Sequence, residues 1–201
     1  MPSPISSRID NMSDLELCYL PATEAIARFK AKTLSPVELL AALIRRAEQV
    51  EPVINAFTYR HFDEAMDKAR KAEAKYASGK RTRALEGLPI GIKDENLIKG
   101  KPTSSGSLIM KDFVADKTSV GNERILRAGG IVHARTATPE FSSAGYTNSR
   151  LWGVTRNPWN SEFTPGGSSG GTAASLAAGT SAIATGSDIG GSIRIPAGTC
   201  G

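Results

Sequence analysis

The sequence predicts an α/β fold, in which N-terminal helices precede strands and helices that alternate along the chain. Apolar residues recur at helical spacing over much of the first 76 residues, and short apolar runs typical of buried strands begin at residue 88. Later, a glycine-serine turn leads into a helix of small residues and then into another strand. With 201 residues, 40% of them hydrophobic and 22% charged, the chain has the composition of a globular protein large enough to build a core.

The N-terminal helices are predicted from apolar spacing and from capping residues. After a polar start over 1–13, a helix is expected over 15–29, with Thr23 as a turn or cap residue. The segment Ser35-Pro36-Val37-Glu38 is a capping box with proline at the first helical position, so a second helix begins there. Its apolar stripe has a period of 3.6 and consists of Leu39, Leu40, Leu43, Ile44, Ala47 and Val50.

Proline and glycine residues are expected to separate the later elements. Glu51-Pro52 should end the second helix, because the residue before a proline avoids helical backbone angles. Gly79 should stop a third helix, and Asn157-Pro158-Trp159-Asn160 has the composition of a turn. The remaining patterns predict helices over 62–76, 120–127 and 171–178, and strands over 88–92, 131–134 and 181–185.

The charge pattern and the cysteines argue against several classes of protein. The net charge is +5, and residues 60–83 hold eight Lys/Arg against four Asp/Glu; a solvated amphipathic helix explains this run, so no nucleic-acid partner is expected. Cys18 and Cys200 form neither a disulfide framework nor a zinc site, which suits a reducing cytoplasm, and no metal or other cofactor is expected. No apolar run is long enough for a membrane span, and residues 1–6 lack the apolar region of a secretory signal.

Two serines on glycine-framed turns dominate the last third of the chain. They lie in Gly166-Gly167-Ser168-Ser169-Gly170-Gly171 and in Asp188-Ile189-Gly190-Gly191-Ser192-Ile193-Arg194-Ile195-Pro196. Taken alone, the first motif is typical of a flexible loop, or of a phosphate cradle at a helix N-terminus, although no Gly-Lys-Ser/Thr follows it. From residue 164 to 201 the ionisable side chains are Asp188, Arg194 and Cys200. So little charge indicates a buried hydroxyl site served by backbone amides, which points to acyl transfer.

A lysine is the best candidate for the base of such a site. Amide hydrolysis needs an activated nucleophile, a stabiliser of the oxyanion and a proton donor for the amine. His61 and His133 both lie far from the serine turns in sequence, and His133 falls in an apolar strand as a packed core residue, so a Ser-His-Asp triad is improbable. Lys93 ends the predicted strand over 88–92; alone, such a lysine is more often a solvated strand end. To be neutral near pH 7 its pKa must fall by about 3 units, at a cost of about 4 kcal/mol, and burial shifts it in that direction.

Together these residues resemble the amidase signature enzymes, the amidohydrolases with a Ser-cisSer-Lys triad. The resemblance covers about residues 15–201 and rests on Lys93, Ser168 and Ser192 at the family's spacing. Further matching segments are Gly87-Leu88-Pro89-Ile90-Gly91-Ile92-Lys93-Asp94, Thr138-Pro139-Glu140-Phe141 and Gly153-Val154-Thr155-Arg156-Asn157-Pro158-Trp159. One departure is Arg135, which stands where many relatives have lysine and should alter local packing.

The resemblance implies a role for each residue of the site. Ser192 would be the nucleophile, Lys93 the general base, neutral in the free enzyme, and Ser168, in a cis peptide after Gly167, would bridge the two. Backbone N–H groups would form the oxyanion hole, contributed by Ile189, Gly190, Gly191 and Ser192. The side chains expected to hold this loop and the lysine in place are those of Ser169, Asp188 and Arg194. The segment after the Pro-Glu-Phe stretch lines the acyl site in relatives, which makes Ser142 and Ser143 candidates for substrate contact.

The resemblance also bears on domain organisation and function. Amidase signature enzymes are roughly twice this length or more, so we expect a helical segment over 1–86 and, over 87–201, the first part of a catalytic core whose mixed sheet is incomplete at the C-terminus. The expected activity is hydrolysis of a small-molecule amide to a carboxylate and ammonia or an amine, through an acyl-enzyme on Ser192. The alternatives are a glutaminase subunit of a tRNA-dependent amidotransferase, although such subunits usually carry glutamine at the position of Ile195, and an inactive fragment of either enzyme. The apolar faces of the helices over 15–50 leave two interpretations, a homodimer or packing onto the sheet.

Overall fold

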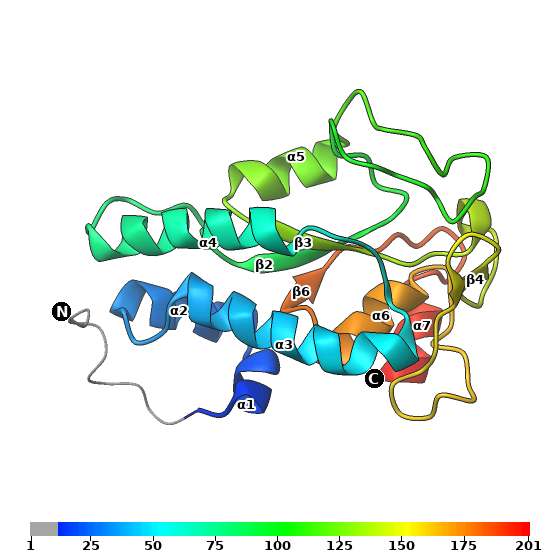
Figure 1. Ribbon diagram of the computed structural model, residues 1–201, viewed down its shortest axis with the longest axis horizontal. Helices are drawn as coiled ribbons and strands as arrows, with labels where there is room; N and C mark the ends of the chain where they lie inside the picture. The colour runs from blue at the N-terminus through cyan, green and yellow to red at the C-terminus, as the bar shows by residue number, and fades with distance from the viewer. Residues whose placement is uncertain (1–11) are drawn as a thin grey trace.

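A computed structural model describes residues 12–201 of the chain (Figure 1). The polar start predicted over 1–13 lies outside the described residues except for its last two, and the N-terminal six residues on which the expectation of no secretory signal rests lie outside entirely. In the described part, helices pack around a four-stranded mixed sheet, as predicted for an α/β chain.

The first predicted helix is two helices, α1 (Asp14–Cys18) and α2 (Ala22–Ala31), so the prediction of one helix over 15–29 was wrong. Pro21 separates them because it is extended (φ −54°, ψ 135°) and restricts the residue before it. Ser13 caps α1 in a capping box with Glu16, whereas Thr23 lies inside α2 and caps nothing.

The second predicted helix, α3 (Pro36–Ile54), begins as the capping box requires. The Ser35 hydroxyl accepts hydrogen bonds from the N–H groups of Val37 and Glu38, both at 3.1 Å. The predicted end at Pro52 was wrong, because the helix runs through that proline to Ile54. Proline in the last turn removes a single intrahelical hydrogen bond, and the helix ends two residues later where Asn55 turns left-handed at φ 49°.

The other predicted elements form close to their expected places. They are α4 (Phe62–Ala77), β2 (Pro89–Lys93), α5 (Val120–Arg127), β3 (Ile131–Thr136), α6 (Gly170–Ala177) and β6 (Ile183–Ala184). Gly79 follows α4 at φ 69°, and the Asn157 side chain accepts a hydrogen bond from the Trp159 N–H at 2.9 Å, which confirms that turn. The sequence patterns did not predict β1 (Phe57–Arg60), the short 3₁₀ helix η1 (Glu140–Ser142), the hairpin of β4 (Asn148–Ser149) and β5 (Gly153–Val154), and α7 (Arg194–Cys200).

The sheet has the order β1-β3-β2-β6. Strand β2 is parallel to both β3 and β6, and β1 is antiparallel to β3, so the sheet is mixed, as expected. Every residue of β2 and β3 is buried, as in parallel strands covered on both faces. Strand β1 belongs to the N-terminal part but pairs with β3, so the sheet spans the division predicted at residue 86, and that division stays a prediction.

The helical layer covers the apolar stripe that the sequence placed on α3. Leu39, Leu40 and Leu43 are buried; Leu39 and Leu43 pack in one cluster with Phe29 of α2, and Leu40 packs with alanines of α4. In Figure 1, α3 and α4 lie side by side, and these two helices contact each other along their length. Packing inside the chain therefore accounts for these faces. No helix within residues 12–201 has both the length and the apolar character that a membrane crossing requires.

Helix α6 approaches β3 closely, as the small residues of this helix predict. A Cβ atom added at Gly171 would lie 2.3 Å from the Ala137 backbone nitrogen and 2.7 Å from the Ala56 carbonyl oxygen. Gly171→Ala should therefore lower the free energy of unfolding by about 1–3 kcal/mol or more, because rigid backbone must move. Urea unfolding measures this, with Gly121→Ala in α5, where the added Cβ meets open space, as the matched control. Equal midpoints for the two variants would contradict the prediction.

Candidate active site

The end of β2 holds Lys93 at the centre of the sheet. Its side chain is fully buried, its N–H donates to the Thr185 hydroxyl at 3.0 Å, and the next N–H, of Asp94, donates to the Thr136 carbonyl at 3.0 Å. Central strands on both sides therefore fix the backbone that carries the lysine. This is the buried strand end that the apolar run over 88–92 predicted.

Buried Arg135 of β3 holds the turn that follows Lys93. Its Nη2 donates to the Asn96 carbonyl at 2.7 Å and to the Lys93 carbonyl at 3.3 Å, and lies 3.6 Å from the Asp94 carboxylate. The Asp94 carboxylate also accepts from the N–H and hydroxyl of Ser104. The departure from lysine at position 135 thus places a guanidinium behind the lysine, where several donors reach the turn at once.

The Lys93 amine faces three oxygen-bearing side chains. Its Nζ lies 2.7 Å from Ser168 Oγ, 2.8 Å from Ser187 Oγ and 3.4 Å from Glu95 Oε1. Burial lowers the pKa of Lys93, because a low-dielectric surrounding disfavours the ammonium form, whereas the Glu95 carboxylate acts in the opposite direction. The net direction is the one that a general base near neutral pH needs.

The first glycine motif brings Ser168 to the lysine. The peptide bond between Gly167 and Ser168 is cis, as the resemblance implied, and Gly166 has φ 80°. A Cβ atom at Gly167 would lie 2.6 Å from the Tyr146 backbone nitrogen, so only glycine fits against this loop. Helix α6 begins directly after the motif, at Gly170. The turn is thus a packed part of the fold, which rejects its interpretation as a flexible loop.

The second motif is organised around Asp188. Its carboxylate accepts hydrogen bonds from the N–H groups of Gly191 at 2.7 Å and of Ile193 at 3.1 Å, and from the Arg194 side chain at 2.9 and 3.0 Å. These donors hold the pKa of Asp188 well below its usual range, the Arg194 guanidinium most strongly. Ser169 ties this loop to the first motif, because its N–H donates to the Ser192 carbonyl at 3.1 Å.

The proposed oxyanion donors differ in their bonding. The Gly191 N–H is already donated to Asp188, whereas the N–H groups of Ile189, Gly190 and Ser192 have no protein acceptor within residues 12–201. The Ile189 side chain is fully exposed, and Ser192 is half-buried. Three of the four predicted amides are therefore available to a substrate oxygen in this structure.

Both serines line one cavity of about 500 Å³. Its walls also include Ser142 and Ser143, the candidates for substrate contact, together with Ile189 and Gly190 of the second motif. The remaining lining residues are Glu95, Phe141, Ala144, Gly145, Gly167, Ser187 and Ile195. The cavity thus combines hydroxyl groups and backbone amides at its base with apolar side chains, an arrangement suited to a largely uncharged acyl compound.

The structure joins some of the predicted residues directly and leaves others apart. Lys93 contacts Ser168, but among the described residues no hydrogen bond joins the hydroxyls of Ser168 and Ser192, so the bridge between them stays a prediction. His133 is a buried core residue, as expected; its Nε2 lies 3.0 Å from the Thr180 carbonyl, and burial lowers its pKa to about 4. No group of three His, Cys, Asp or Glu side chains in the described part is placed to hold a metal ion.

Sequence reasoning missed two residues that contact the lysine, Ser187 and Glu95. Ser187 precedes the second motif by one residue, and the amine reaches its hydroxyl because the Ser187 N–H also bonds Ser169 Oγ at 3.3 Å, which draws the two loops together. Glu95 lies two residues beyond Lys93 at the end of a strand. Its closeness in sequence was the available signal, but the direction of its side chain depends on the turn.

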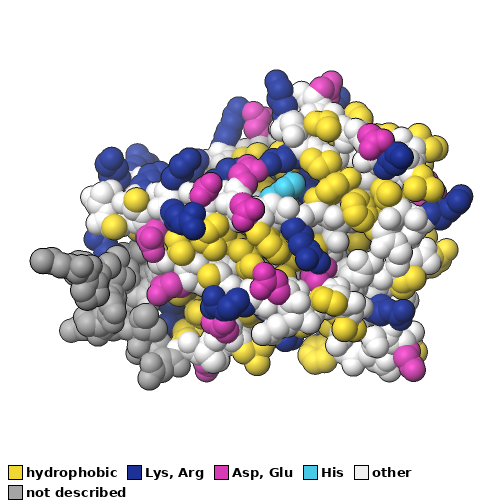
Figure 2. Space-filling view, viewed as in Figure 1, with side chains coloured by type: hydrophobic (Ala, Val, Ile, Leu, Met, Phe, Trp, Pro, Cys, Tyr) yellow, Lys and Arg dark blue, Asp and Glu magenta, His cyan; other side chains and the backbone are white. Residues whose placement is uncertain are grey.

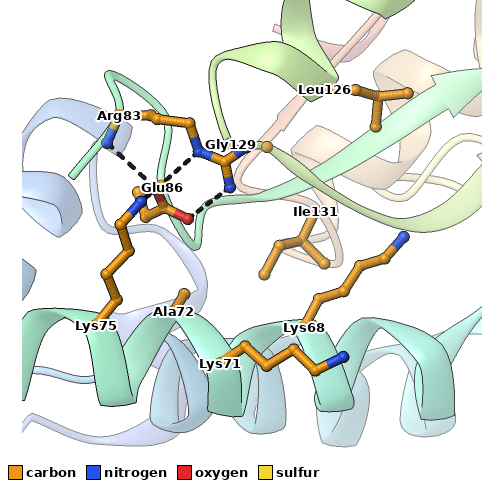
Figure 3. Close-up of a pocket in the computed structure, with 10 residues that line it drawn as sticks. Lys68, Lys71, Ala72, Lys75, Arg83, Glu86, Leu126, Gly129 and Ile131 are labelled. Atoms are coloured by element: carbon orange, nitrogen blue, oxygen red, sulfur yellow. Dashed lines mark hydrogen bonds and ion pairs between the residues drawn. The ribbon is translucent and has the colours of Figure 1, made fainter.

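A second hollow, of about 550 Å³, lies between α4 and the segment that includes Arg83 and Glu86 (Figure 3). Lys75 and Arg83 both bind Glu86, with shortest N–O distances of 2.6 Å, and Lys68 pairs with Glu64 at 2.7 Å. Figure 2 shows Lys and Arg gathered over this part of the surface with acidic residues among them. Its lining residues include no serine, threonine or cysteine, so it lacks the hydroxyl chemistry of the other cavity.

The Asp188 interactions predict a measurable effect on the loop. Asp188→Asn removes the charge that binds Arg194 and weakens the acceptor of the Gly191 N–H, so the amides near Ser192 lose their fixed orientation. We expect reaction of Ser192 with a fluorophosphonate to slow by about tenfold or more, since oxyanion donors are sensitive to position. The second-order labelling rate measures this, and an unchanged thermal unfolding midpoint excludes a folding defect. A variant that reacts as fast as the parent would contradict the role of Asp188.

Comparison with known proteins shows consistent similarity. A protein-family model described as Amidase matches residues 38–201. A glutamyl-tRNA(Gln) amidotransferase subunit from Carboxydothermus hydrogenoformans is 40% identical over 187 residues, which cover 93% of this chain and 39% of that protein. The protein of the same name from Gloeothece citriformis is 40% identical over 170 residues, 85% of this chain and 35% of that protein. The chain therefore spans less than two fifths of the length of these relatives.

Solved structures of the same fold cover nearly the whole chain. A fatty acid amide hydrolase superposes with a TM-score of 0.89 at 29% identity, over 100% of this chain and 38% of the other. A bacterial aryl acylamidase of the amidase signature family gives 0.83 at 34% identity, over 89% and 37%. The corresponding glutamyl-tRNA(Gln) amidotransferase subunit from Thermotoga maritima gives 0.76 at 28% identity, over 95% and 39%.

Proposed function

The chain belongs to the amidase family, and on that premise we propose that it hydrolyses a carboxylic acid amide through an acyl-enzyme on Ser192. The observation that carries the proposal is the 2.7 Å contact between buried Lys93 Nζ and Ser168 Oγ, in a cavity that Ser192 also lines. A neutral lysine joined to a serine hydroxyl supplies the base that the nucleophile needs at neutral pH.

Each step of the reaction has a group in this cavity. Ser192 Oγ attacks the amide carbon, its proton passes through the Ser168 hydroxyl to the Lys93 amine, and the amides near Ser192 stabilise the negative oxygen. The lysine then returns the proton through Ser168 to the nitrogen, the carbon–nitrogen bond breaks, and ammonia or an amine leaves. Water then attacks the ester carbon with Lys93 again accepting the proton. The carboxylate is released and Ser192 regains its hydrogen.

Fluorophosphonate labelling of the purified protein tests this function. We expect the probe to form a covalent bond with Ser192, because the reaction needs only the nucleophile, the base and the amides. Peptide mass spectrometry locates the label, and denatured protein serves as the control because it keeps every serine but loses the site. A label elsewhere, or equal labelling of the denatured protein, would overturn the proposal.

The apolar rim of the cavity favours an uncharged amide with an apolar acyl group. Phe141 and Ile189 are largely exposed at this rim, and Ile195 packs over Gly191, where an added Cβ would lie 2.9 Å from its Cδ1. The fatty acid amide hydrolase and the aryl acylamidase among the solved structures support the same class. Hydrolysis of a fatty acyl or aryl amide, measured by release of the amine, is the expected activity.

The curated relatives support a second candidate function. They are named as subunits of a glutamyl-tRNA(Gln) amidotransferase, so a glutaminase that passes ammonia to a partner protein is the alternative. Measuring ammonia released from glutamine alongside amine released from a hydrophobic anilide separates the two. Turnover of glutamine alone would favour the amidotransferase function, and turnover of the anilide alone would favour the amidase.

A further inference from the structure

A carboxylate that has no part in the proposed reaction stands beside the lysine of the site. Glu95 follows Lys93 by two residues, and the turn after β2 directs its side chain back over the cavity, where Oε1 lies 3.4 Å from Lys93 Nζ. The Glu95 side chain is 21% exposed, whereas the lysine side chain is fully buried. An ion pair this sheltered is screened less by water and salt than a surface pair.

The Glu95 carboxylate is held in its position from the far side. Its Oε2 accepts a hydrogen bond from the Ser142 hydroxyl of η1, and Ser142 Oγ in turn lies 2.9 Å from Thr138 Oγ1. Contacts therefore run in an unbroken series from Thr138 through Ser142, Glu95 and Lys93 to Ser168. A carboxylate fixed in this way limits the positions that the flexible lysine side chain can occupy.

Other charged groups near the lysine are directed elsewhere. Asp94 points to Ser104 and to Arg135, and Arg135 of β3 reaches the Lys93 carbonyl rather than its amine. On the second motif, Asp188 is paired with Arg194. Within residues 12–201, Glu95 is the acidic side chain within 4 Å of the Lys93 amine. The electrostatic effect of one residue on the lysine can therefore be isolated.

Two opposing effects act on Lys93, and Glu95 supplies one of them. Burial lowers the pKa of the lysine, while attraction to the Glu95 carboxylate and their hydrogen bond raise it again. Burial raises the pKa of Glu95, but hydrogen bonds from Ser142 and Ser187 and the charge of Lys93 outweigh this effect and lower it. A carboxylate charged in this way favours the ammonium form of its neighbour.

We propose that Glu95 is a positioning residue for the base: its carboxylate orients the Lys93 amine toward Ser168 and sets the pH below which the site becomes inactive. The inference rests on the proposed function for its catalytic consequence, but the charge coupling between the two residues is a property of the fold alone. Only the neutral amine accepts a proton, so a carboxylate that favours the ammonium form moves the acidic limit of activity to higher pH. Removing that carboxylate moves the limit to lower pH.

Titration of Lys93 in the Glu95→Gln variant tests the coupling without any catalytic readout. The ¹³C resonance of the lysine ε-carbon, assigned by its loss in Lys93→Arg, reports the protonation state of the amine. We expect the midpoint in Glu95→Gln to fall by about one pH unit, the lower end of the shift that an opposite charge at this distance produces. Glu95→Asp, which keeps the charge but withdraws it by one methylene, should give an intermediate midpoint and covers the case in which the glutamine variant does not fold.

The control is Glu140→Gln, which removes a carboxylate in η1 that hydrogen bonds Ser107 at 2.6 Å. It should leave the Lys93 midpoint unchanged. Equal midpoints in Glu95→Gln and the parent, or an equal shift in the control, would overturn the proposal. The pH dependence of fluorophosphonate labelling at Ser192 is the second readout, and its acidic limit should move with the lysine midpoint. A lysine midpoint that moves in protein that does not label would support the coupling and overturn the hydrolase function.

Discussion

Replacing Ser192 by alanine is expected to abolish covalent labelling and to reduce amide hydrolysis by about 10⁴- to 10⁶-fold, as loss of a serine nucleophile does in other hydrolases. The half-buried Ser192 lines the cavity that contains the amine of Lys93 and the hydroxyl of Ser168. Alanine removes the attacking oxygen but keeps the backbone N–H of the oxyanion hole. Binding of the substrate should therefore persist while the acyl-enzyme cannot form.

Mass spectrometry of the protein after incubation with substrate or fluorophosphonate checks this expectation. Ser161→Ala serves as a matched control, because it removes a serine hydroxyl from an exposed turn outside the cavity. Substantial turnover by the Ser192→Ala variant would sink the assignment of the nucleophile. Loss of activity in the control as well would show that the assay responds to something other than the site.

Replacing Lys93 by alanine is expected to reduce kcat by about 10²- to 10⁴-fold, the usual contribution of a general base, with little change in KM. The lysine approaches the nucleophile through Ser168, and its amine is not among the groups that line the cavity, so substrate binding does not depend on it. In the parent, activity should fall as the pH drops through the lowered pKa of Lys93, because the ammonium form cannot accept a proton. The residual activity of the alanine variant should lack this acidic limb.

The pH profile of kcat/KM for the parent and the variant is the decisive measurement. Lys99→Ala is the control, since it removes an exposed lysine shortly after the same strand. The urea midpoint of Lys93→Ala is measured as well, because the substitution leaves Glu95 without its cationic partner. If the alanine variant keeps the parent's acidic limb while it remains folded, Lys93 is not the base.

Local patterns were sufficient for most of the secondary structure. The capping box at Ser35 and Glu38 begins α3, and the apolar run before Lys93 forms a buried strand, because both signals act within a few residues. The errors arose where a local rule competed with packing. Pro52 does not end α3, since the cost of one missing hydrogen bond in the last turn is small beside the burial of Ile54 just after it.

Strand β1 illustrates what a local pattern cannot contain. Its four residues are only partly buried beyond Phe57, so they show no alternation of apolar and polar side chains. Their extended form depends on pairing with Thr136, Arg135 and Ala134 of β3, far along the chain. Short strands of this kind form because a partner offers hydrogen bonds, and the partner is fixed by the tertiary fold.

The amino-acid sequence determined which chemical groups the site contains: a lysine at a strand end, two serines on glycine turns, and Asp188 and Arg194 in an otherwise nearly uncharged segment. Only the tertiary structure decided which of these groups meet. It places Ser187 and Glu95 on the amine of Lys93 and occupies the Gly191 N–H with Asp188. The physical reason is that composition and periodicity are local, whereas contacts of about 3 Å depend on strand register, turn direction and side-chain rotamers that the whole fold sets.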